Sequence, residues 1–424
     1  MKKILNSFIP LFVFSMCLTS CGDNASSSSI ESFDSDSEAV VIEDIPNESF
    51  HTIAQAEYLA DTYESVSKYA SGTKEMSIPY GNVFALESTN AKYMCVSDDI
   101  DFSEYRLFNI EGIKAPRIRN LLSDTTYFYK TYTSLEFIDA NLVESGSLKT
   151  DNVLPRNVYI PSLDKSHFVT NVRDLGGYAS SLGGKVRQGL VYRGGRLSGG
   201  ETTKYTYDEN GEVATKKVYK PALCFSDDGY NQLTKVLKIT NEVDLRRATK
   251  DQTIEEITTT SGTKSVVTSE HIENGNRSAY PDLIKGMNVH TISINASETD
   301  FLRGADGKNN GVEYIKEFFN ICAEPTNYPM YVHCYIGTDR TGALCYLLGA
   351  LCGIDRIALV RDYLFSNFGN IGGSRDPYAI LNIYEPVLNS FNKPTLAENA
   401  ESYLLSIGVS QAQIDSVRNI MIEK

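Results

Sequence analysis

The 424-residue sequence lacks tryptophan and has no excess of positive charge: 54 Asp and Glu outnumber 40 Lys and Arg, which gives a net charge of −14. Without a global basic field, the chain is not expected to bind nucleic acid or an anionic membrane through its charge. Eight cysteines are too few over this length for a disulfide scaffold. With 42% hydrophobic and 22% charged residues, the composition also excludes a coiled coil, a collagen-like chain and a wholly disordered protein. The length suggests two or three domains.

The N-terminal apolar run of residues 8–17 is too short to span a bilayer. It follows Lys2 and Lys3 and precedes Leu-Thr-Ser-Cys21, so residues 1–20 are predicted to be a secretory signal. This ending resembles the bacterial lipobox, which implies a lipid on Cys21 and export to the cell envelope or surface of a bacterium; a plain signal peptide is the alternative. Residues 22–67 contain no Lys or Arg but eleven Asp or Glu, and we expect an acidic tether over residues 21–50.

Two small segments follow the predicted tether. Residues 51–76 begin with good helix formers and are expected to contain a short helix. Residues 77–153 hold short β-like runs separated by turn residues, which predicts a small β-sandwich. The spacing of Leu121, Thr125 and Tyr127 resembles the late strand of fibronectin type III domains, where these three residue types form a corner that locks the sandwich.

From residue 154 to residue 424, strand-like runs alternate with helical segments, which predicts an α/β domain with a central sheet flanked by helices. The fold class is therefore an α+β multidomain protein. The expected strands are residues 190–193, 239–245, 289–294 and 330–333, and the expected helices are residues 229–237, 312–322, 342–352, 356–365 and 396–405. Residues 205–215 predict a hairpin with a type I′ Asn-Gly turn, whereas the polar residues 251–286 are expected to be irregular.

The run of residues 330–342, Met-Tyr-Val-His-Cys-Tyr-Ile-Gly-Thr-Asp-Arg-Thr-Gly, carries the chemistry. Five residues separate Cys334 from Arg340, enough for a loop whose backbone N–H groups turn inward and form an anion nest at a helix N-terminus. The same field favours the thiolate form of a cysteine. Arg340 supplies a planar, bidentate donor for two phosphate oxygens, and Gly337 allows a backbone conformation that a side chain would block.

This pattern, His333-Cys334-x-x-Gly337-x-x-Arg340-Thr341-Gly342, resembles the signature of the cysteine-dependent protein tyrosine phosphatases. Together with residues 171–178 (Asn-Val-Arg-Asp-Leu-Gly-Gly-Tyr) and 362–367 (Asp-Tyr-Leu-Phe-Ser-Asn), it is similar to the bacterial tyrosine/lipid phosphatases over about residues 155–424. The resemblance implies a cysteinyl-phosphate mechanism without metal or cofactor, acting on phosphotyrosine and, in some members, on phosphoinositides. The family's loop lysine is Thr338 here, which weakens the lipid assignment.

The candidate catalytic residues are Cys334 as nucleophile, Arg340 as phosphate ligand and Asp339 as general acid, with Asp300 and Glu298 as alternative acids on a separate polar loop. The rest of the phosphate-binding loop comprises His333, Tyr335, Ile336, Gly337, Thr338, Thr341 and Gly342. Arg173, Asp174 and Arg246 are possible pocket residues, although internal ion pairs are the favoured interpretation for them.

The sequence therefore predicts a lipid-anchored phosphate monoester hydrolase, with phosphotyrosine as the favoured substrate. One alternative is an inositol-phosphate or phosphoinositide phosphatase that uses the same loop. The other is a surface binding lipoprotein with a degraded catalytic site, although a pure binder has no need of the nucleophile. The expected partners are a phosphorylated protein, peptide or inositol substrate and, through the lipid, a membrane. No oligomeric state is predicted.

Overall fold

The computed structural model describes residues 41–45, 58, 81–88, 90–162, 169–247, 249–273, 277–294, 311–369, 371 and 374–424. The predicted signal peptide, Cys21 and most of residues 21–76 lie outside this part of the chain. Residues 42–44, expected in the tether, instead form strand β1 (Ile42–Asp44), which pairs in parallel with β4 (Arg106–Asn109). Of the predicted helical segment only Tyr58 is described: it is helical and buried, and its Oη donates to the Arg361 carbonyl at 2.5 Å.

The β-rich segment forms two sheets, as its alternation of apolar runs and turns predicts. The strands are β2 (Asn82–Val83), β3 (Tyr93–Ser97), β4, β5 (Arg117–Ile118), β6 (Thr126–Tyr132) and β7 (Leu142–Lys149). One sheet has the order β1-β4-β3-β6-β7, and β2 pairs with β5 in the other. At the predicted corner, the Leu122 N–H donates to Tyr127 Oη at 2.9 Å. The tyrosine thus ties the turn before β6 to its own strand.

The second half of the chain is built on a five-stranded sheet of order β16-β13-β17-β10-β8. β16 (Asn288–Thr291), β13 (Asn241–Asp244), β17 (Met330–His333) and β10 (Val191–Gly194) are parallel, and β8 (Arg173–Asp174) is antiparallel to β10 at the edge. Since the carboxyl ends of parallel strands share one edge of a sheet, the residues that follow β10, β13 and β17 meet there. The α/β expectation for this part of the chain is met.

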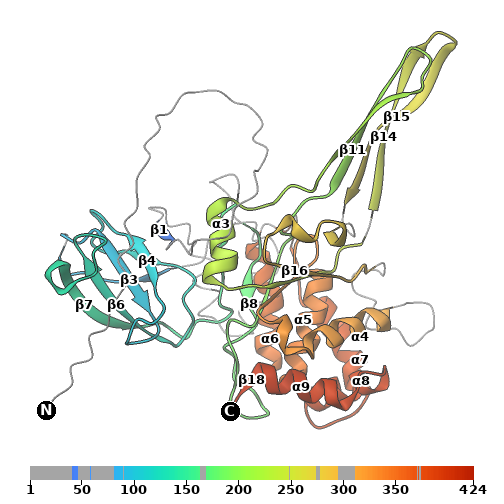
Figure 1. The fold of residues 1–424 in the computed structure, drawn as a ribbon. Coiled ribbons are helices and arrows are strands. Elements are labelled where there is room, and N and C mark those ends of the chain that lie inside the picture. Colours follow the sequence, from blue (N-terminus) through green and yellow to red (C-terminus); the bar gives the residue numbers. More distant parts are fainter. Residues whose placement is uncertain are drawn as a thin grey trace, which may run out of the picture. The chain divides into compact units, whose positions relative to one another are not determined.

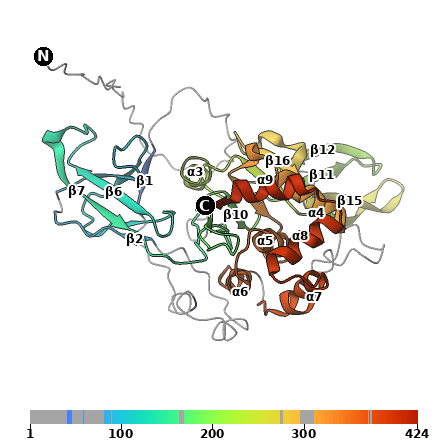
Figure 2. The same ribbon diagram turned by 90° about the horizontal axis from the view of Figure 1, so that it is seen from below.

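Both faces of this sheet are covered, because the side chains of a strand alternate between its faces. Met330 and Val332 belong to the larger core, whereas Tyr331 packs in a second core with Leu233 and Leu237. The larger core also receives residues of α4 (Gly311–Cys322), α5 (Asp339–Leu351), α6 (Arg356–Phe365), α8 (Leu396–Ser406) and α9 (Gln411–Met421). Figure 2 shows the helices of the larger core gathered together, α5 next to α6 and α8, and α4 next to α9. The central strand β17 is thus buried on both sides.

The helices lie close to the predicted ranges. They are α3 (Asp227–Asn231) continued by a π-helical turn (Gln232–Val236), α4 (Gly311–Cys322), α5 (Asp339–Leu351), α6 (Arg356–Phe365), α7 (Glu385–Asn389), α8 (Leu396–Ser406) and α9 (Gln411–Met421). Thr395 and Glu398 form a capping box that starts α8. Helices α7 and α9 and the short strand pair β9 (Lys185–Val186) and β18 (Ile422–Glu423) were not predicted. In the part of the chain that is described, no helix is long and apolar enough to cross a membrane.

Four long strands form a separate antiparallel sheet, which we call the arm (Figure 1). Its order is β12-β11-β15-β14, with β11 (Glu201–Tyr207), β12 (Val213–Tyr219), β14 (Thr249–Thr259) and β15 (Gly262–Glu273). The expectation that residues 251–286 are irregular was therefore wrong for β14 and β15. Both strands are polar on most positions, so they lack the apolar alternation by which a half-buried strand is recognised.

The hairpin of β11 and β12 was predicted correctly, but its turn type was not. A type I′ turn requires positive φ at both central residues. Here Asn210 does not have positive φ, whereas Gly211 has φ +77° and donates its N–H to the Asp208 carbonyl at 3.0 Å. The Asp208 side chain in turn accepts the Asn210 N–H at 2.9 Å. The loop is therefore a type I turn followed by a left-handed glycine, for which the aspartate supplies the local hydrogen bond.

Candidate active site

The signature loop joins the buried strand β17 to helix α5, as predicted. Cys334 follows β17 directly and is only 2% exposed, so the thiol lies at the bottom of the site. Gly337 has φ +72°, and a Cβ at this position would lie 2.1 Å from the Gly194 carbonyl oxygen at the end of β10. Only glycine both adopts this positive φ readily and leaves room for the Gly194 carbonyl oxygen. The neighbouring strand therefore determines the curvature of the loop.

Two side chains hold the loop's carbonyl groups from beneath. Arg193 of β10 donates from Nη2 to the carbonyls of Gly337 (2.9 Å) and Thr338 (3.4 Å). Asn171 donates from Nδ2 to the Ile336 carbonyl at 3.0 Å and to Thr338 Oγ1 at 3.3 Å. Since these carbonyls are held from outside the loop, we expect its amides to face the interior, as an anion nest requires.

Asp362 of α6 holds the arginines that support the loop. Its Oδ1 accepts from Arg173 Nε at 2.6 Å and its Oδ2 from Arg193 Nη1 at 2.5 Å, and all three side chains are buried. Although burial opposes ionisation, Arg173 and Arg193 hold the pKa of Asp362 below its usual value. Arg173 also donates to Ser366 Oγ at 3.2 Å. The motif residues Arg173 and Asp362, far apart in the sequence, thus form one buried ionic cluster.

Asp174, the next residue of the first motif, is likewise internal. Its carboxylate pairs with Arg156 (2.6 Å) and accepts the N–H groups of Gly176 (2.8 Å) and Gly189 (2.7 Å). The residue is fully buried. Asp174 therefore shapes the turn after β8, and its carboxylate is directed to the chain rather than to a ligand.

His333 is enclosed by acceptors. Its Nε2 lies 2.9 Å from Glu242 Oε1, and its Nδ1 lies 2.9 Å from the Cys334 carbonyl and 3.9 Å from Asp244 Oδ1. The ring of His333 therefore links the peptide group of Cys334 to the Glu242 carboxylate.

Arg246 and Arg277 neutralise the two carboxylates around His333. Arg246 donates from Nη2 to Asp244 at 2.8 Å, and Arg277 donates from Nε to Glu242 at 2.9 Å. Burial opposes ionisation of Asp244, but His333 and Arg246 lower its pKa. Glu242, Asp244 and His333 are close enough to hold a metal ion. Because two guanidinium groups already occupy their oxygens, a further cation is disfavoured here.

Arg340 lies in the first turn of α5 and is 7% exposed; its Nη1 donates to the Leu245 carbonyl at 3.1 Å, beyond the end of β13. Thr341 and Gly342 follow it and are buried, and Gly342 packs against Tyr363. Thr338 is also fully buried, so the position of the family's lysine points into the protein in this chain.

Tyr335, by contrast, has an exposed side chain at the outer side of the loop. The residue is 44% exposed, and the Arg196 guanidinium lies 4.1 Å from the centre of its ring. Tyr335 and Arg196 therefore form the rim.

Asp339 has a partner that the sequence did not indicate. Arg375 donates from Nε and Nη2 to the two carboxylate oxygens of Asp339, both at 2.8 Å. Asn367, the last residue of the third motif, fixes the backbone of Arg375 by accepting its N–H (2.7 Å) and donating to its carbonyl (2.9 Å). The other predicted acids, Glu298 and Asp300, lie outside the described residues. Arg375 could not be found from the sequence because nothing in its local pattern points to residue 339.

Two further cysteines, Cys345 and Cys352, lie in α5 and directly after it. Cys345 and Cys352 are fully buried among apolar side chains of the core, as their spacing on one helix face predicts. Burial raises the pKa of the Cys345 thiol to about 11 and that of Cys352 to about 12. Both are core residues and unreactive at neutral pH.

A model of the tyrosine phosphatase family matches residues 165–215 and 203–423, which together include every residue discussed above from Arg173 to Arg375. The chain belongs to this family. It is therefore a phosphatase, a phosphoric monoester hydrolase.

Two further comparisons accompany this match. The chain is similar to the core catalytic domain of the PP-IP phosphatase SIW14 from S. cerevisiae, solved in complex with citrate. The likeness has 15% sequence identity and a TM-score of 0.23, and covers 39% of this chain and 83% of that one. No curated protein matches the phosphatase.

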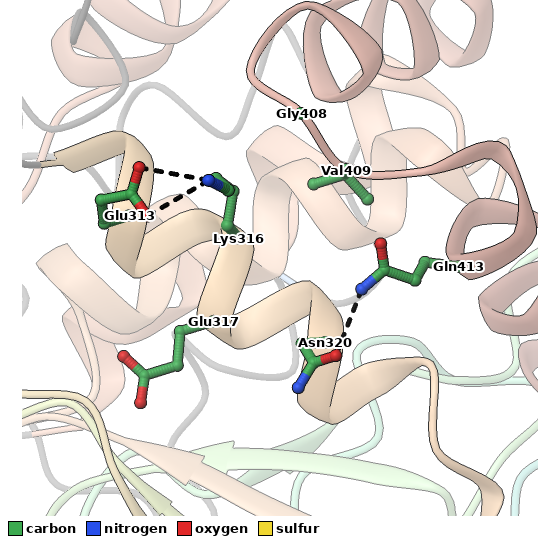
Figure 3. A pocket seen from close by; sticks show the side chains of 7 residues that line it. All are labelled: Glu313, Lys316, Glu317, Asn320, Gly408, Val409 and Gln413. Atoms are coloured by element: carbon green, nitrogen blue, oxygen red, sulfur yellow. Dashed lines mark hydrogen bonds and ion pairs between the residues drawn. The ribbon is translucent and has the colours of Figure 1, made fainter.

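A second hollow lies away from the signature residues. A cavity of about 370 Å³ is lined by α4 and by the start of α9 with the turn before it (Figure 3). Lys316 pairs with Glu313 within α4, and Gln413 donates to Asn320 at 3.3 Å. Four of the seven lining residues are thus paired with one another, and none of the seven belongs to the signature motifs.

Proposed function

We propose that the phosphatase hydrolyses phosphotyrosine through a cysteinyl-phosphate intermediate. The observation that supports this most directly is the depth of Cys334, 2% exposed beneath a rim that carries Tyr335 and Arg196. A phosphate on the long phenol of tyrosine reaches such a thiol, whereas the short side chains of serine and threonine do not. The exposed Tyr335 ring also offers a surface on which an aromatic leaving group stacks.

The first chemical step forms the bond between Cys334 Sγ and phosphorus and breaks the bond between phosphorus and the phenolic oxygen. Arg340 and the inward amides of the loop hold the three equatorial oxygens, where charge gathers in the transition state. The departing oxygen takes a proton from the Asp339 carboxyl. In the second step water attacks phosphorus, the Asp339 carboxylate accepts the water proton, and the bond from phosphorus to Sγ breaks to return the thiolate.

The ion pair with Arg375 bears on both steps. The Arg375 guanidinium donates to both oxygens of Asp339 and so fixes where this carboxyl group lies. The same position serves the proton donation of the first step and the proton acceptance of the second.

We further propose that the mature protein is an exported lipoprotein attached through Cys21, and that residues 77–153 are a fibronectin type III-like domain. The sequence Leu-Thr-Ser-Cys after a short apolar run supports the lipid. The two sheets and the hydrogen bond from Leu122 to Tyr127 support the β-sandwich.

The experiment that tests the substrate class compares phosphate release from free phosphotyrosine, phosphoserine and a soluble inositol polyphosphate. We expect kcat/KM for phosphotyrosine to exceed that for phosphoserine by about 100-fold or more, the discrimination of a site that the smaller substrate cannot fill. Equal rates on the two amino acids would refute the argument from depth. Faster turnover of the inositol polyphosphate would instead establish the alternative substrate.

A further inference from the structure

The arm is rooted at the edge of the sheet where the catalytic loop lies. β11 begins six residues after Gly195, and in between the Arg196 N–H donates to the Tyr335 carbonyl at 3.1 Å. β14 begins four residues after Leu245, whose carbonyl accepts Arg340 Nη1. Two separate insertions, one after β10 and one after β13, therefore leave the domain beside the signature loop and join through the pairing of β11 with β15.

The arm is long and largely exposed. β14 has 11 residues, which extend for about 37 Å at the rise of an antiparallel strand. All seven residues of β12 are exposed, and so are residues 250–256 of β14. The tips of the hairpins are tied together, since the Thr260 N–H donates to the Glu209 carbonyl at 2.9 Å. A stiff sheet of this length reaches far beyond any single phosphate-bearing headgroup, so it suits a macromolecular substrate.

The two outer edges of the arm differ in how open they are to another strand. Lysines on an edge strand oppose pairing with a further chain. β12 has Lys216 and Lys217 at its centre, placed over the rings of Tyr205 and Tyr219. β14 has no lysine after Lys250 and no proline, and six of its 11 residues are the β-branched Thr or Ile that favour strands. Its edge is therefore the one suited to β-augmentation.

The side chains of β14 indicate what kind of segment would pair there. Ile254 is 63% exposed, and the exposed Glu255 and Glu256 follow it. Asp251 lies on the same strand, whereas Lys250 is engaged with Glu270 of β15 at 2.6 Å. The edge is thus acidic with one apolar position. It repels a polyanionic lipid surface and attracts a peptide with basic residues.

We propose that β14 docks an extended, basic segment of a phosphorylated protein substrate, which adds to the arm as a fifth strand while its phosphotyrosine enters the signature loop. The inference rests on the proposed function and adds to it the form of the substrate. Glu255 lies six residues from the start of β14, about 20 Å along the strand. A segment that reaches both sites needs roughly ten residues between its phosphotyrosine and its basic residues.

The test uses the full chain and a triple variant, Ile254→Lys, Glu255→Lys and Glu256→Lys, which places lysines on the edge and reverses its charge. The matched control is Lys216→Glu with Lys217→Glu on β12. The substrates are free phosphotyrosine and two phosphotyrosine peptides of about 25 residues, one with basic and one with acidic flanks. We expect the triple variant to lose about tenfold in kcat/KM on the basic peptide, at low salt above all, and to keep its activity on free phosphotyrosine.

The outcomes separate this inference from the proposed function. If the wild type releases no phosphate from free phosphotyrosine but turns over an inositol polyphosphate, the proposed substrate class fails. If it hydrolyses free phosphotyrosine and the triple variant keeps full activity on the basic peptide, the docking inference alone is overturned. The docking inference is also overturned if the β12 control loses as much kcat/KM on the basic peptide as the triple variant does. An equal loss of kcat/KM by the triple variant on the basic and the acidic peptide would overturn it as well.

Discussion

The assignment of Asp339 as general acid can be tested through its ion pair with Arg375. We consider three variants, Asp339→Asn, Arg375→Ala and the double variant, with Asp300→Asn as the competing assignment. Loss of a general acid costs about 100-fold or more in kcat on a substrate whose leaving group needs a proton, and much less on p-nitrophenyl phosphate. Asp339→Asn should therefore show this dependence on the leaving group, and Asp300→Asn should not.

The effect of Arg375→Ala follows from the geometry of the pair. The contact is bidentate, which makes it stronger than a single bond, but the side chains are 28% and 12% exposed, so solvent weakens it. A coupling of about 1 kcal/mol, some fivefold, is expected for a pair of this kind. Arg375 holds both oxygens of Asp339 in place, so Arg375→Ala, which removes that positioning, should lower kcat on the poor leaving group by roughly fivefold, far less than Asp339→Asn.

The double variant supplies the decisive control. If Arg375 acts through Asp339, then in the Asp339→Asn background the further change of Arg375 should add no dependence on the leaving group. The measurement is kcat for a series of aryl phosphates of increasing leaving-group pKa. Equal losses by Asp339→Asn across the series, together with a graded loss by Asp300→Asn, would refute our assignment and place the acid on the other loop.

Three further predictions concern the nucleophile, the support of the loop and the anchor. Cys334→Ser should lower turnover below about a thousandth of wild type yet still bind inorganic phosphate in titration calorimetry; higher activity would argue against this nucleophile. Asp362→Asn should destabilise the protein by about 3–5 kcal/mol in urea, because it leaves two buried arginines without a counter-charge, whereas the N-cap variant Asp355→Asn of the same helix should change stability little. Folding lowers the pKa of Asp362, so the contribution of this carboxylate to the free energy of unfolding is complete above about pH 4 and is lost as the pH falls below that value. Between about pH 5 and pH 3, Asp362→Asn should therefore lose less stability than wild type. Cys21→Ala should release the protein from the membrane fraction of the expressing bacterium, and unchanged mass and detergent partitioning would contradict a lipid at this residue.

The strand, loop and helix that carry the candidate catalytic residues could be predicted from the sequence because their determinants are local. The spacing from Cys334 to Arg340, the apolar strand before it and the helix after it all lie within about twenty residues, where strand and helix periods are readable. The same holds for the capping box at Thr395 and for most helix boundaries. The two strands β14 and β15 were missed because a sheet that is exposed on both faces has no apolar alternation to reveal it.

The partners of the site residues were decided only by the tertiary structure. Arg193, Asp362 and Arg375 come from three different elements and meet the loop because parallel strands end at one edge of the sheet and α6 packs beside α5. No spacing along the chain specifies such contacts, since each depends on how distant elements pack. The sequence alone therefore indicates which residues are candidates for the chemistry, whereas the fold determines which charges hold them in position and places the arm at the edge of the candidate site.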